Sequence, residues 1–398
     1  MSSAVSLGDQ IRSLRESAGL QAAQLAASLG VDPSAVSNIE HGKRSVKASE
    51  LAVIAEFLGV SQLAILEPDS LLARLPVAAR ADGASVEGSV MARLTAMAEL
   101  HHVLADGGHP SRRIGPVPAN GNPEGWLDRA NTLARWASVR FRAAKGTDDP
   151  FTSLVEAIER ELGIDVLVDS FGDASLAGAS ITDPEFSLIA VSSDQPRPRA
   201  LFTLAHELGH VLNADGATLN IDSDLRASTD RERLANAFAA ALLMPEEDLR
   251  EAVASNGLDP DSLARILVEF GVSYESLVYR LHNLQCVNAA GRDRLRSVGW
   301  TGLLARVEDE DLRRALLAAR GSRPERRPPL LLASRCLRGL LDGIVGAAPL
   351  AGLLDVPRDD LISAISTYER SDAFELDRTP SEQDAPEEVL LSFDASPV

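Results

Sequence analysis

The chain has 398 residues, of which 45% are hydrophobic and 4% aromatic, so we expect two or three domains with aliphatic cores. Its formal net charge of −19 argues against broad, nonspecific nucleic-acid binding, and its two cysteines, Cys286 and Cys336, are too few for a disulfide framework. Because it has neither a signal-peptide pattern at its start nor an uncharged apolar run of about 18 residues, we expect a soluble cytoplasmic protein without membrane contact.

Residues 1–70 contain short helical patterns separated by tight breaks. Asp32 is a suitable N-cap, Pro33 suits the first position of a helix, and Gly30 and Gly42 are typical helix stops. Two short helices joined by a turn that contains glycine are typical of a helix-turn-helix. The pattern therefore predicts an all-α domain at this end of the chain.

The stretch LAASLGVDPSAVSNIEHGKR resembles the Xre/Cro-type DNA-binding domain. The resemblance implies that a helix from about Asp32 to His41 enters the major groove of an operator. It implies polar contacts to the groove from four residues, Ser34, Ser37, Asn38 and His41. It implies phosphate contacts from two more, Lys43 and Arg44.

Two features of this domain depart from that family. Ser/Thr-Gln commonly opens the second helix, where this chain has Gln21 and Ala22, and residues 1–70 hold eight acidic residues against five lysines and arginines. Because phosphate neutralisation supplies much of the affinity for DNA, we expect a monomer to bind weakly and a homodimer to bind two half-sites. The alternative is a helix-turn-helix fold used only for protein contact or dimerisation.

Residues 71–122 have the composition of a linker with one amphipathic helix and a Gly/Pro-rich loop. Its histidines, His101, His102 and His109, fit solvated or interface positions better than metal ligation. Two amphipathic helices follow, PEGWLDRANTLARWASVRFRAA and FTSLVEAIERELG. Two strand-like runs come next, IDVLVDSF and FSLIAVSS, separated by GDASLAGASITDPE. A small sheet of this kind could bind an extended peptide as an added strand.

Residues 199–213, RALFTLAHELGHVLN, contain an H-E-x-x-H pattern. In a helix His206 and His210 lie only about 40° apart around the axis, opposite an apolar stripe. Two neutral imidazoles one turn apart can occupy two corners of a Zn²⁺ tetrahedron and leave Glu207 to act on a metal-bound water. The pentapeptide alone is equally compatible with an amphipathic helix whose histidines are solvated.

A second helix is predicted over residues 229–245, TDRERLANAFAAALLMP, with Thr229 or Asp230 as its N-cap. Glu232 lies near its start and is within reach of a loop that follows His210. A catalytic zinc needs three protein ligands and one open position, and Glu232 would supply the third ligand. The alternative is that this acidic residue only favours the helix N-terminus.

Together, FTLAHELGHVL and ERLANAFAAALLMP resemble the ImmA/IrrE family of zinc metallopeptidases, a gluzincin-like group, and the similarity covers roughly residues 151–287. The resemblance implies a mainly α fold with a small β-sheet, an α+β zincin-like domain that we assign to residues 123–300. It implies Glu207 as general base and a set of three zinc ligands, His206, His210 and Glu232. Arg199 matches the family, but Leu201 stands where a second basic residue is frequent.

The sequence leaves the residue that would stabilise the oxyanion open among four candidates, Tyr274, Tyr279, Arg280 and His282. Residues 301–370 predict a further helical region, in which an ordinary helical hairpin is favoured over a second DNA-binding unit. Residues 371–398 hold eight acidic residues and one arginine, which predicts a disordered acidic tail.

These features predict a transcriptional regulator that carries a zinc-dependent endopeptidase. Related peptidases cleave helix-turn-helix repressors, so the implied substrate is a partner repressor or antitoxin, or this chain itself, in a stress, phage or toxin–antitoxin circuit. One alternative is a DNA-binding transcription factor whose zincin-like domain is a non-catalytic sensor or dimerisation module. Another is an antitoxin-like binding protein that forms a stable complex with its partner.

Overall fold

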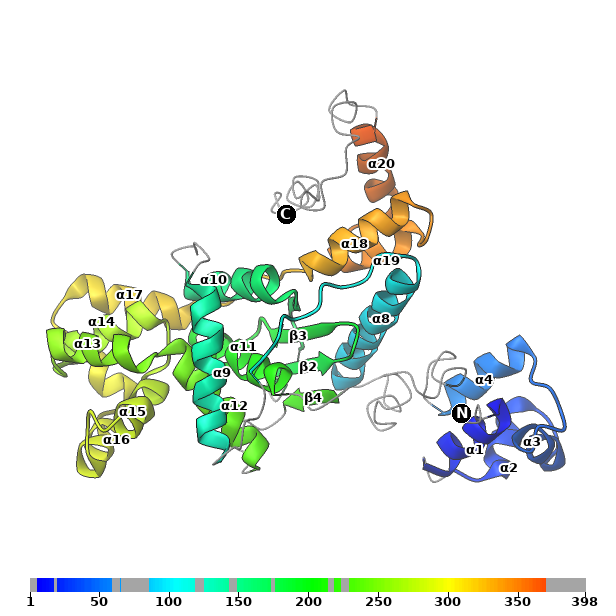
Figure 1. Cartoon of the computed structure of the whole chain (residues 1–398), viewed down its shortest axis with the longest axis horizontal. Helices are drawn as coiled ribbons and strands as arrows, with labels where there is room; N and C mark the ends of the chain where they lie inside the picture. Colours follow the sequence, from blue (N-terminus) through cyan, green and yellow to red (C-terminus); the bar gives the residue numbers. More distant parts are fainter. Residues whose placement is uncertain are drawn as a thin grey trace. The chain divides into compact units, whose positions relative to one another are not determined.

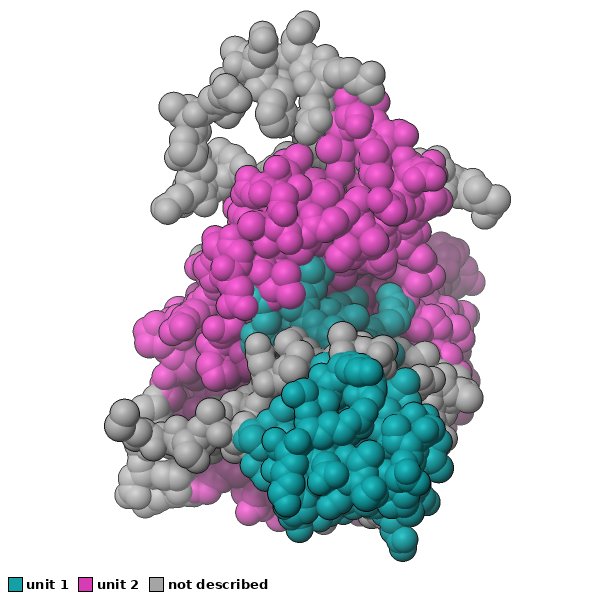
Figure 2. Space-filling view, turned by 90° about the vertical axis from the view of Figure 1, so that its right-hand side faces the viewer, with its two compact units in different colours: residues 1–102 teal, residues 103–398 magenta. Residues whose placement is uncertain are grey.

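The structure is a computed structural model, mainly helical with one small sheet, as the sequence predicts. It describes residues 6–17, 20–58, 65, 86–118, 125–142, 149–172, 176–213, 218–222 and 229–369. Most of the expected linker before residue 86 and the acidic tail therefore lie outside the described residues. The chain divides into two compact units, residues 1–102 and 103–398 (Figure 2). Within the described ranges, no helix has the length and apolar character that a membrane span requires.

The described residues of the first unit form four short helices and the start of a longer one (Figure 1): α1 (Leu7–Ser17), α2 (Ala22–Leu29), α3 (Pro33–Glu40), α4 (Ala48–Leu58) and α8 (Val86–Asp106). The predicted breaks hold, because Gly30 ends α2 at φ 64° and Asp32 is the N-cap of α3. Gly8 allows α1 to approach the end of α3, since a Cβ there would lie 2.3 Å from the carbonyl oxygen of Ile39.

A buried ion pair fixes α1 against α3. Arg15 donates from Nε to Glu40 Oε1 at 2.6 Å and from Nη2 to Glu40 Oε2 at 2.9 Å. Its Nη1 also donates to the carbonyl oxygen of Leu20 at 2.8 Å. Such a bidentate pair fixes geometry as well as neutralising the charge. The pair removes one acid and one base from the surface and leaves the net charge of the domain unchanged.

The second unit is built around a four-stranded sheet in the order β1-β3-β2-β4. Its strands are β1 (Asp165–Asp169), β2 (Gly178–Thr182), β3 (Ser187–Ser192) and β4 (Thr218–Asp222). β1 runs parallel to β3, whereas β2 runs antiparallel to both β3 and β4. β1 and β3 are the two strands that the sequence predicts. β2 lies in the stretch expected only to separate them, because glycine and serine give it the composition of a loop.

Four helices surround this sheet on the way to the C-terminal region: α9 (Trp126–Phe141), α10 (Pro150–Ala157), α11 (Arg197–Leu212) and α12 (Asp230–Leu243). α11 packs against β2 and β3 and against α12, and α12 also packs against α9 (Figure 1). Gly209 makes the α11–α12 contact close, since a Cβ there would lie 3.1 Å from Ala235 Cα and 3.0 Å from the Phe238 ring. α11 is consequently buried on both its apolar and its polar face.

Five helices form a second hydrophobic core: α13 (Glu246–Asn256), α14 (Pro260–Phe270), α15 (Tyr274–Asn283), α16 (Ala289–Leu304) and α17 (Glu310–Gly321). Three more follow: α18 (Leu330–Leu341), α19 (Ala347–Leu354) and α20 (Arg358–Glu369). Between α17 and α18 the chain returns to the sheet edge, where Arg327 forms an antiparallel bridge with Val168 of β1. The bridge uses two backbone hydrogen bonds, of 2.8 and 2.9 Å.

Buried carboxylates hold this returning segment in place. Arg327 pairs with Glu159, and Arg326 Nε donates to Asp169 Oδ1 at 2.6 Å. Asp165 Oδ1 accepts from the backbone N–H of Leu332 at 2.6 Å. Burial raises the pKa of Asp165 to about 7, even though the Arg335 guanidinium favours its charged form. The segment before the C-terminal helices is thus attached to the sheet through three buried carboxylates, Glu159, Asp165 and Asp169.

We expect Asp165→Asn to flatten the pH dependence of folding stability. The folded pKa of Asp165 lies above that of an unfolded aspartate, so the folded state holds the proton more tightly and wild type loses stability as the pH rises from 4 to 7. Each unit between the two pKa values is worth about 1.4 kcal/mol. Urea unfolding followed by tryptophan fluorescence across this range measures the effect, and parallel profiles for the two proteins would contradict it.

Candidate metal centre and recognition helix

Three side chains from two helices converge at one point. His206 and His210 lie on one face of α11, with their Nε2 atoms 3.0 Å apart, and both are at least 97% buried. Glu232 of α12 places Oε2 3.2 Å from His206 Nε2 and Oε1 3.4 Å from His210 Nε2. The structure therefore brings together the three residues that the sequence nominates as metal ligands.

The start of α12 determines where Glu232 points. Thr229 is the N-cap, and its hydroxyl accepts from the backbone N–H of Glu232 at 3.3 Å. The sequence allows either Thr229 or Asp230 as the N-cap. In the structure the N-cap is Thr229, and Asp230 lies in the first turn of α12. Hydrogen bonds from His206 and His210 hold the pKa of the Glu232 carboxyl well below its usual range. The carboxylate is therefore ionised, which is the form that a metal ion binds.

Asn236 orients one of the histidines. It lies one helical turn after Glu232 on α12, and its Oδ1 is 3.1 Å from His206 Nδ1. An amide oxygen there keeps a proton on Nδ1, so Nε2, which donates to Glu232 when no metal is bound, is the nitrogen left to bind a metal ion. Sequence reasoning did not identify this residue, because an asparagine inside a helix carries no signal of its own.

Glu207, the residue after His206 on α11, contacts the sheet. It is fully buried, and its Oε2 accepts from Ser180 Oγ of β2 at 2.6 Å. Gly178 makes room for it, because a Cβ there would lie 3.0 Å from Glu207 Oε1 and 2.6 Å from Thr203 Cγ2. Both contacts come from the strand that the sequence did not reveal. The strand supplies the hydrogen bond and the space that this carboxylate needs.

The donor set fits a zinc ion. Two imidazole nitrogens and one carboxylate oxygen are a ligand set of catalytic zinc sites, in which a fourth position stays open. Ligand atoms about 2.0–2.1 Å from a tetrahedral zinc lie roughly 3.3 Å from one another. The two Nε2 atoms here are 3.0 Å apart, and they lie 3.2 and 3.4 Å from different oxygens of the Glu232 carboxylate. Little rearrangement is therefore needed for His206, His210 and Glu232 to hold the metal.

The four candidates for oxyanion stabilisation have other contacts in and around α15. Tyr274 donates its hydroxyl to the carbonyl oxygen of Leu295 at 2.9 Å, and Tyr279 lies under the guanidinium of Arg296. His282 Nδ1 is 3.3 Å from the carbonyl oxygen of Val287. Arg280 donates from Nε to the carbonyl oxygen of Met244 at 3.0 Å. None of these described contacts involves the three converging residues.

The expected recognition helix is α3, which ends at Glu40. Val36 and Ile39 are buried on one of its faces. Five of the residues that the resemblance implies for DNA are exposed on or just after this helix, Ser34, Ser37, Asn38, His41 and Lys43. Arg44 is half-buried, and its Nη2 donates to Glu50 Oε1 at 2.6 Å. One of the two expected phosphate contacts is therefore engaged inside the domain.

Two stretches of the chain match known families. Residues 6–65 match the model of a helix-turn-helix domain, and residues 159–282 match the Peptidase_M78 model, described as an IrrE N-terminal-like domain. The second range contains both histidines, Glu207 and Glu232. These matches agree with the two resemblances that the sequence motifs carry.

Proteins with similar sequences include two metalloproteases and a transcriptional regulator. The radiation response metalloprotease IrrE of Deinococcus radiodurans is 36% identical over 107 residues, 25% of this chain and 32% of that protein. Its counterpart in Deinococcus deserti is 36% identical over 104 residues, 25% of this chain and 37% of that protein. The HTH-type transcriptional regulator PrpR of Mycobacterium tuberculosis is 25% identical over 313 residues, 70% of this chain and 63% of that protein. The aligned region thus spans about a third of each Deinococcus protein.

We expect Asn236→Ala to weaken metal binding by about 10–100-fold, because outer hydrogen bonds that orient a ligating histidine have effects of this size. Competition with a chromogenic chelator measures the dissociation constant of the variant for Zn²⁺. Asn131→Ala, on α9, is the matched control and should leave it unchanged. Equal affinities for both variants would show that Asn236 does not orient His206.

Proposed function

We propose that this chain, which joins a helix-turn-helix domain of transcription-regulator type to an IrrE-like metallopeptidase domain, is a DNA-bound zinc endopeptidase. Its substrate would be a partner helix-turn-helix repressor or antitoxin, or the chain itself. The convergence of His206, His210 and Glu232, with Glu207 buried beside them, carries the proposal.

The proposal assigns a role to each of these residues. His206, His210 and Glu232 would hold a zinc ion, which would supply Lewis-acid polarisation of the scissile carbonyl. Glu207 accepts a proton from the attacking water and passes it to the leaving amine. The hydroxyl of Ser180 holds the Glu207 carboxylate in place through a 2.6 Å hydrogen bond.

The sheet offers a place for an extended substrate. The β1 edge is already paired with Arg327, whereas β4 is the opposite edge strand. A peptide that adds to β4 gains backbone hydrogen bonds while its side chains determine specificity. β2, the neighbour of β4, carries the serine that binds Glu207. An extended segment at this edge therefore lies one strand away from the proposed general base.

One observation favours a second candidate function. His206 and Glu207 are fully buried and His210 is 97% buried, so of the four residues only Glu232 has appreciable exposure, 18% of its side chain. A site this enclosed suits a transcription factor whose zincin-like domain is a metal-dependent sensor or dimerisation module without turnover. Whether cleavage requires Glu207 separates the two functions, because a sensor needs the metal ligands but no general base.

We expect Glu207→Gln to retain about one equivalent of zinc and to lose cleavage by at least about 100-fold, because a general base contributes a factor of this size or larger. Co-expression with repressors encoded nearby, followed by intact-mass analysis, measures cleavage, and elemental analysis measures zinc. Glu251→Gln, an exposed change on α13, is the control. Cleavage that persists in Glu207→Gln would remove the mechanism, and cleavage that is absent from wild type with zinc bound would favour the sensor.

We expect Asn38→Ala to weaken operator binding by about 1–3 kcal/mol, the usual cost of losing a specific base contact. Binding of the full-length protein to promoter-proximal DNA is measured at low and moderate salt. Ser13→Ala, an exposed change on α1, serves as the control. No binding by folded wild-type protein at either salt would instead support a helix-turn-helix domain that mediates only protein contacts.

A further inference from the structure

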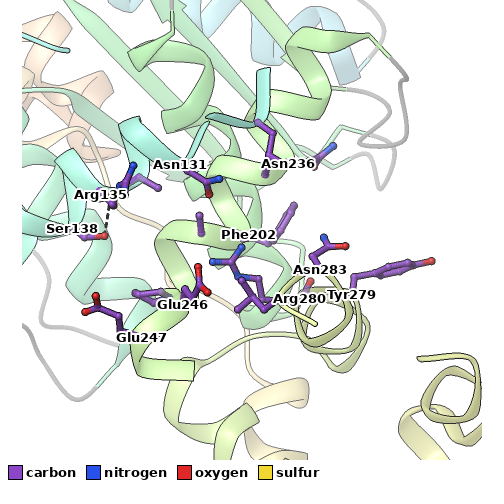
Figure 3. A pocket seen from close by; sticks show the side chains of 18 of the residues that line it. Asn131, Arg135, Ser138, Phe202, Asn236, Glu246, Glu247, Tyr279, Arg280 and Asn283 are labelled. Carbon is purple, nitrogen blue, oxygen red and sulfur yellow. Dashed lines mark hydrogen bonds between the residues drawn. The ribbon is translucent and has the colours of Figure 1, made fainter. Parts of the chain in front are cut away.

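A large cavity of about 1980 Å³ lies in the second unit (Figure 3). Its lining comes from α9, the start of α11, the exposed side of α12, α13 and α15. Apolar rings and side chains contribute part of the wall, among them Trp126, Phe202 and Tyr279. Cavities that combine apolar walls with a few fixed polar groups are the usual sites for small organic ligands.

Arg280 is a buried cation in this lining (Figure 3). It is 92% buried, and its Nε is used to bind the carbonyl oxygen of Met244 at the end of α12. Among the described residues, no carboxylate oxygen lies within 4.0 Å of its guanidinium, and its two terminal nitrogens make no hydrogen bond. Burial lowers the pKa of Arg280, and the carboxylate whose charge opposes this effect most is Glu246. Because no carboxylate contacts the guanidinium directly, its terminal nitrogens can bind an anion in the cavity.

The acidic residues that face the cavity do not supply that anion. Glu246 is exposed, and its Oε1 pairs with Arg250 Nε at 2.8 Å. Three more acids, Asp128, Glu247 and Glu275, are exposed at the surface of the lining. The lining contains six arginines and these four acidic residues, although the whole chain is strongly acidic. The most buried charge in the cavity is therefore positive, while the negative charges remain in contact with solvent.

The cavity also touches the residues that support the metal centre. Asn236, which binds His206 Nδ1, contributes to the lining. Phe202 lines it as well, and its ring centroid lies 6.4 Å from that of His206. Both residues that contact His206 therefore belong to the lining of the cavity.

We propose that this cavity binds a small organic anion, with a carboxylate or phosphate group paired to Arg280 and an apolar body against the aromatic wall. Occupancy alters the position of Asn236 and thereby the metal affinity of His206. Only this second, coupling step rests on the proposed function. Binding of the anion does not depend on it.

The test uses the full-length protein and three probes, hexanoate, phenyl phosphate and inorganic phosphate, at matched ionic strength with hexanol as the uncharged comparison. Isothermal titration calorimetry gives the dissociation constants, and the fluorescence of Trp126 in the cavity wall reports occupancy. We expect at least one organic anion to bind and hexanol to bind at least tenfold more weakly. The relative affinities of hexanoate and phenyl phosphate identify the charged group that the site prefers.

Arg280→Met should weaken anion binding at least tenfold, whereas Arg265→Met, an exposed change on α14 outside the cavity, should not. Ala240→Phe places an aromatic ring in the cavity lining without removing the arginine and should also weaken binding, so it provides a second test if Arg280→Met does not fold. Absence of binding by both organic anions to folded wild-type protein, or binding unaffected by the variants that fold, would overturn the proposal.

Repeating the titrations with Glu207→Gln separates this site from the peptidase, because binding should persist in a variant that lacks the general base. The dissociation constant for Zn²⁺, measured with and without the bound anion, tests the coupling. We expect a change of at least threefold. An unchanged zinc affinity would overturn the coupling, and loss of anion binding in Glu207→Gln would overturn the independence of the two sites.

Discussion

The close approach of α12 to α11 is the constraint on which the rest of the second unit depends. Gly209 permits it, because a Cβ at this position would lie 3.1 Å from Ala235 Cα and 3.0 Å from the Phe238 ring, so a side chain there would push the helices apart by a few tenths of an ångström. The same contact brings the first turn of α12 to the histidine face of α11, so that Glu232 reaches His206 and His210. Gly209, which lies between the two histidines in the sequence, therefore helps to bring Glu232 within reach of them.

Buried charges recur through the structure, and most of them are neutralised within the chain. Arg15 and Glu40 fix the helices of the first unit, and Asp165 accepts from a backbone amide of the segment that returns to the sheet. Pairing of this kind adds geometric specificity more reliably than stability. Arg280 departs from the pattern, because its terminal nitrogens have no acceptor among the described residues. Arg15 is thus paired with a carboxylate of the chain, whereas Arg280 can pair with an anionic ligand.

Sequence patterns predicted the helices of the site well, because each is long and has a clear period or cap. The pattern of α11 also suggested an open histidine face, whereas the structure buries that face against α12. β2 was not predicted, since a buried strand of small residues resembles a loop in composition. Ser180 and Gly178, which bind and accommodate Glu207, were missed with it.

The sequence by itself determined which residue types are available for chemistry: an H-E-x-x-H pair on one helical face, an acid near the start of the next helix, and a helix-turn-helix near the N-terminus. Helical period and caps are local, so a linear pattern can reveal them. Only the tertiary structure decided that Asn236 orients His206, that Ser180 holds Glu207, and that Arg280 is buried without a carboxylate. Each of these contacts joins residues far apart in the chain, and no local period records such a distance.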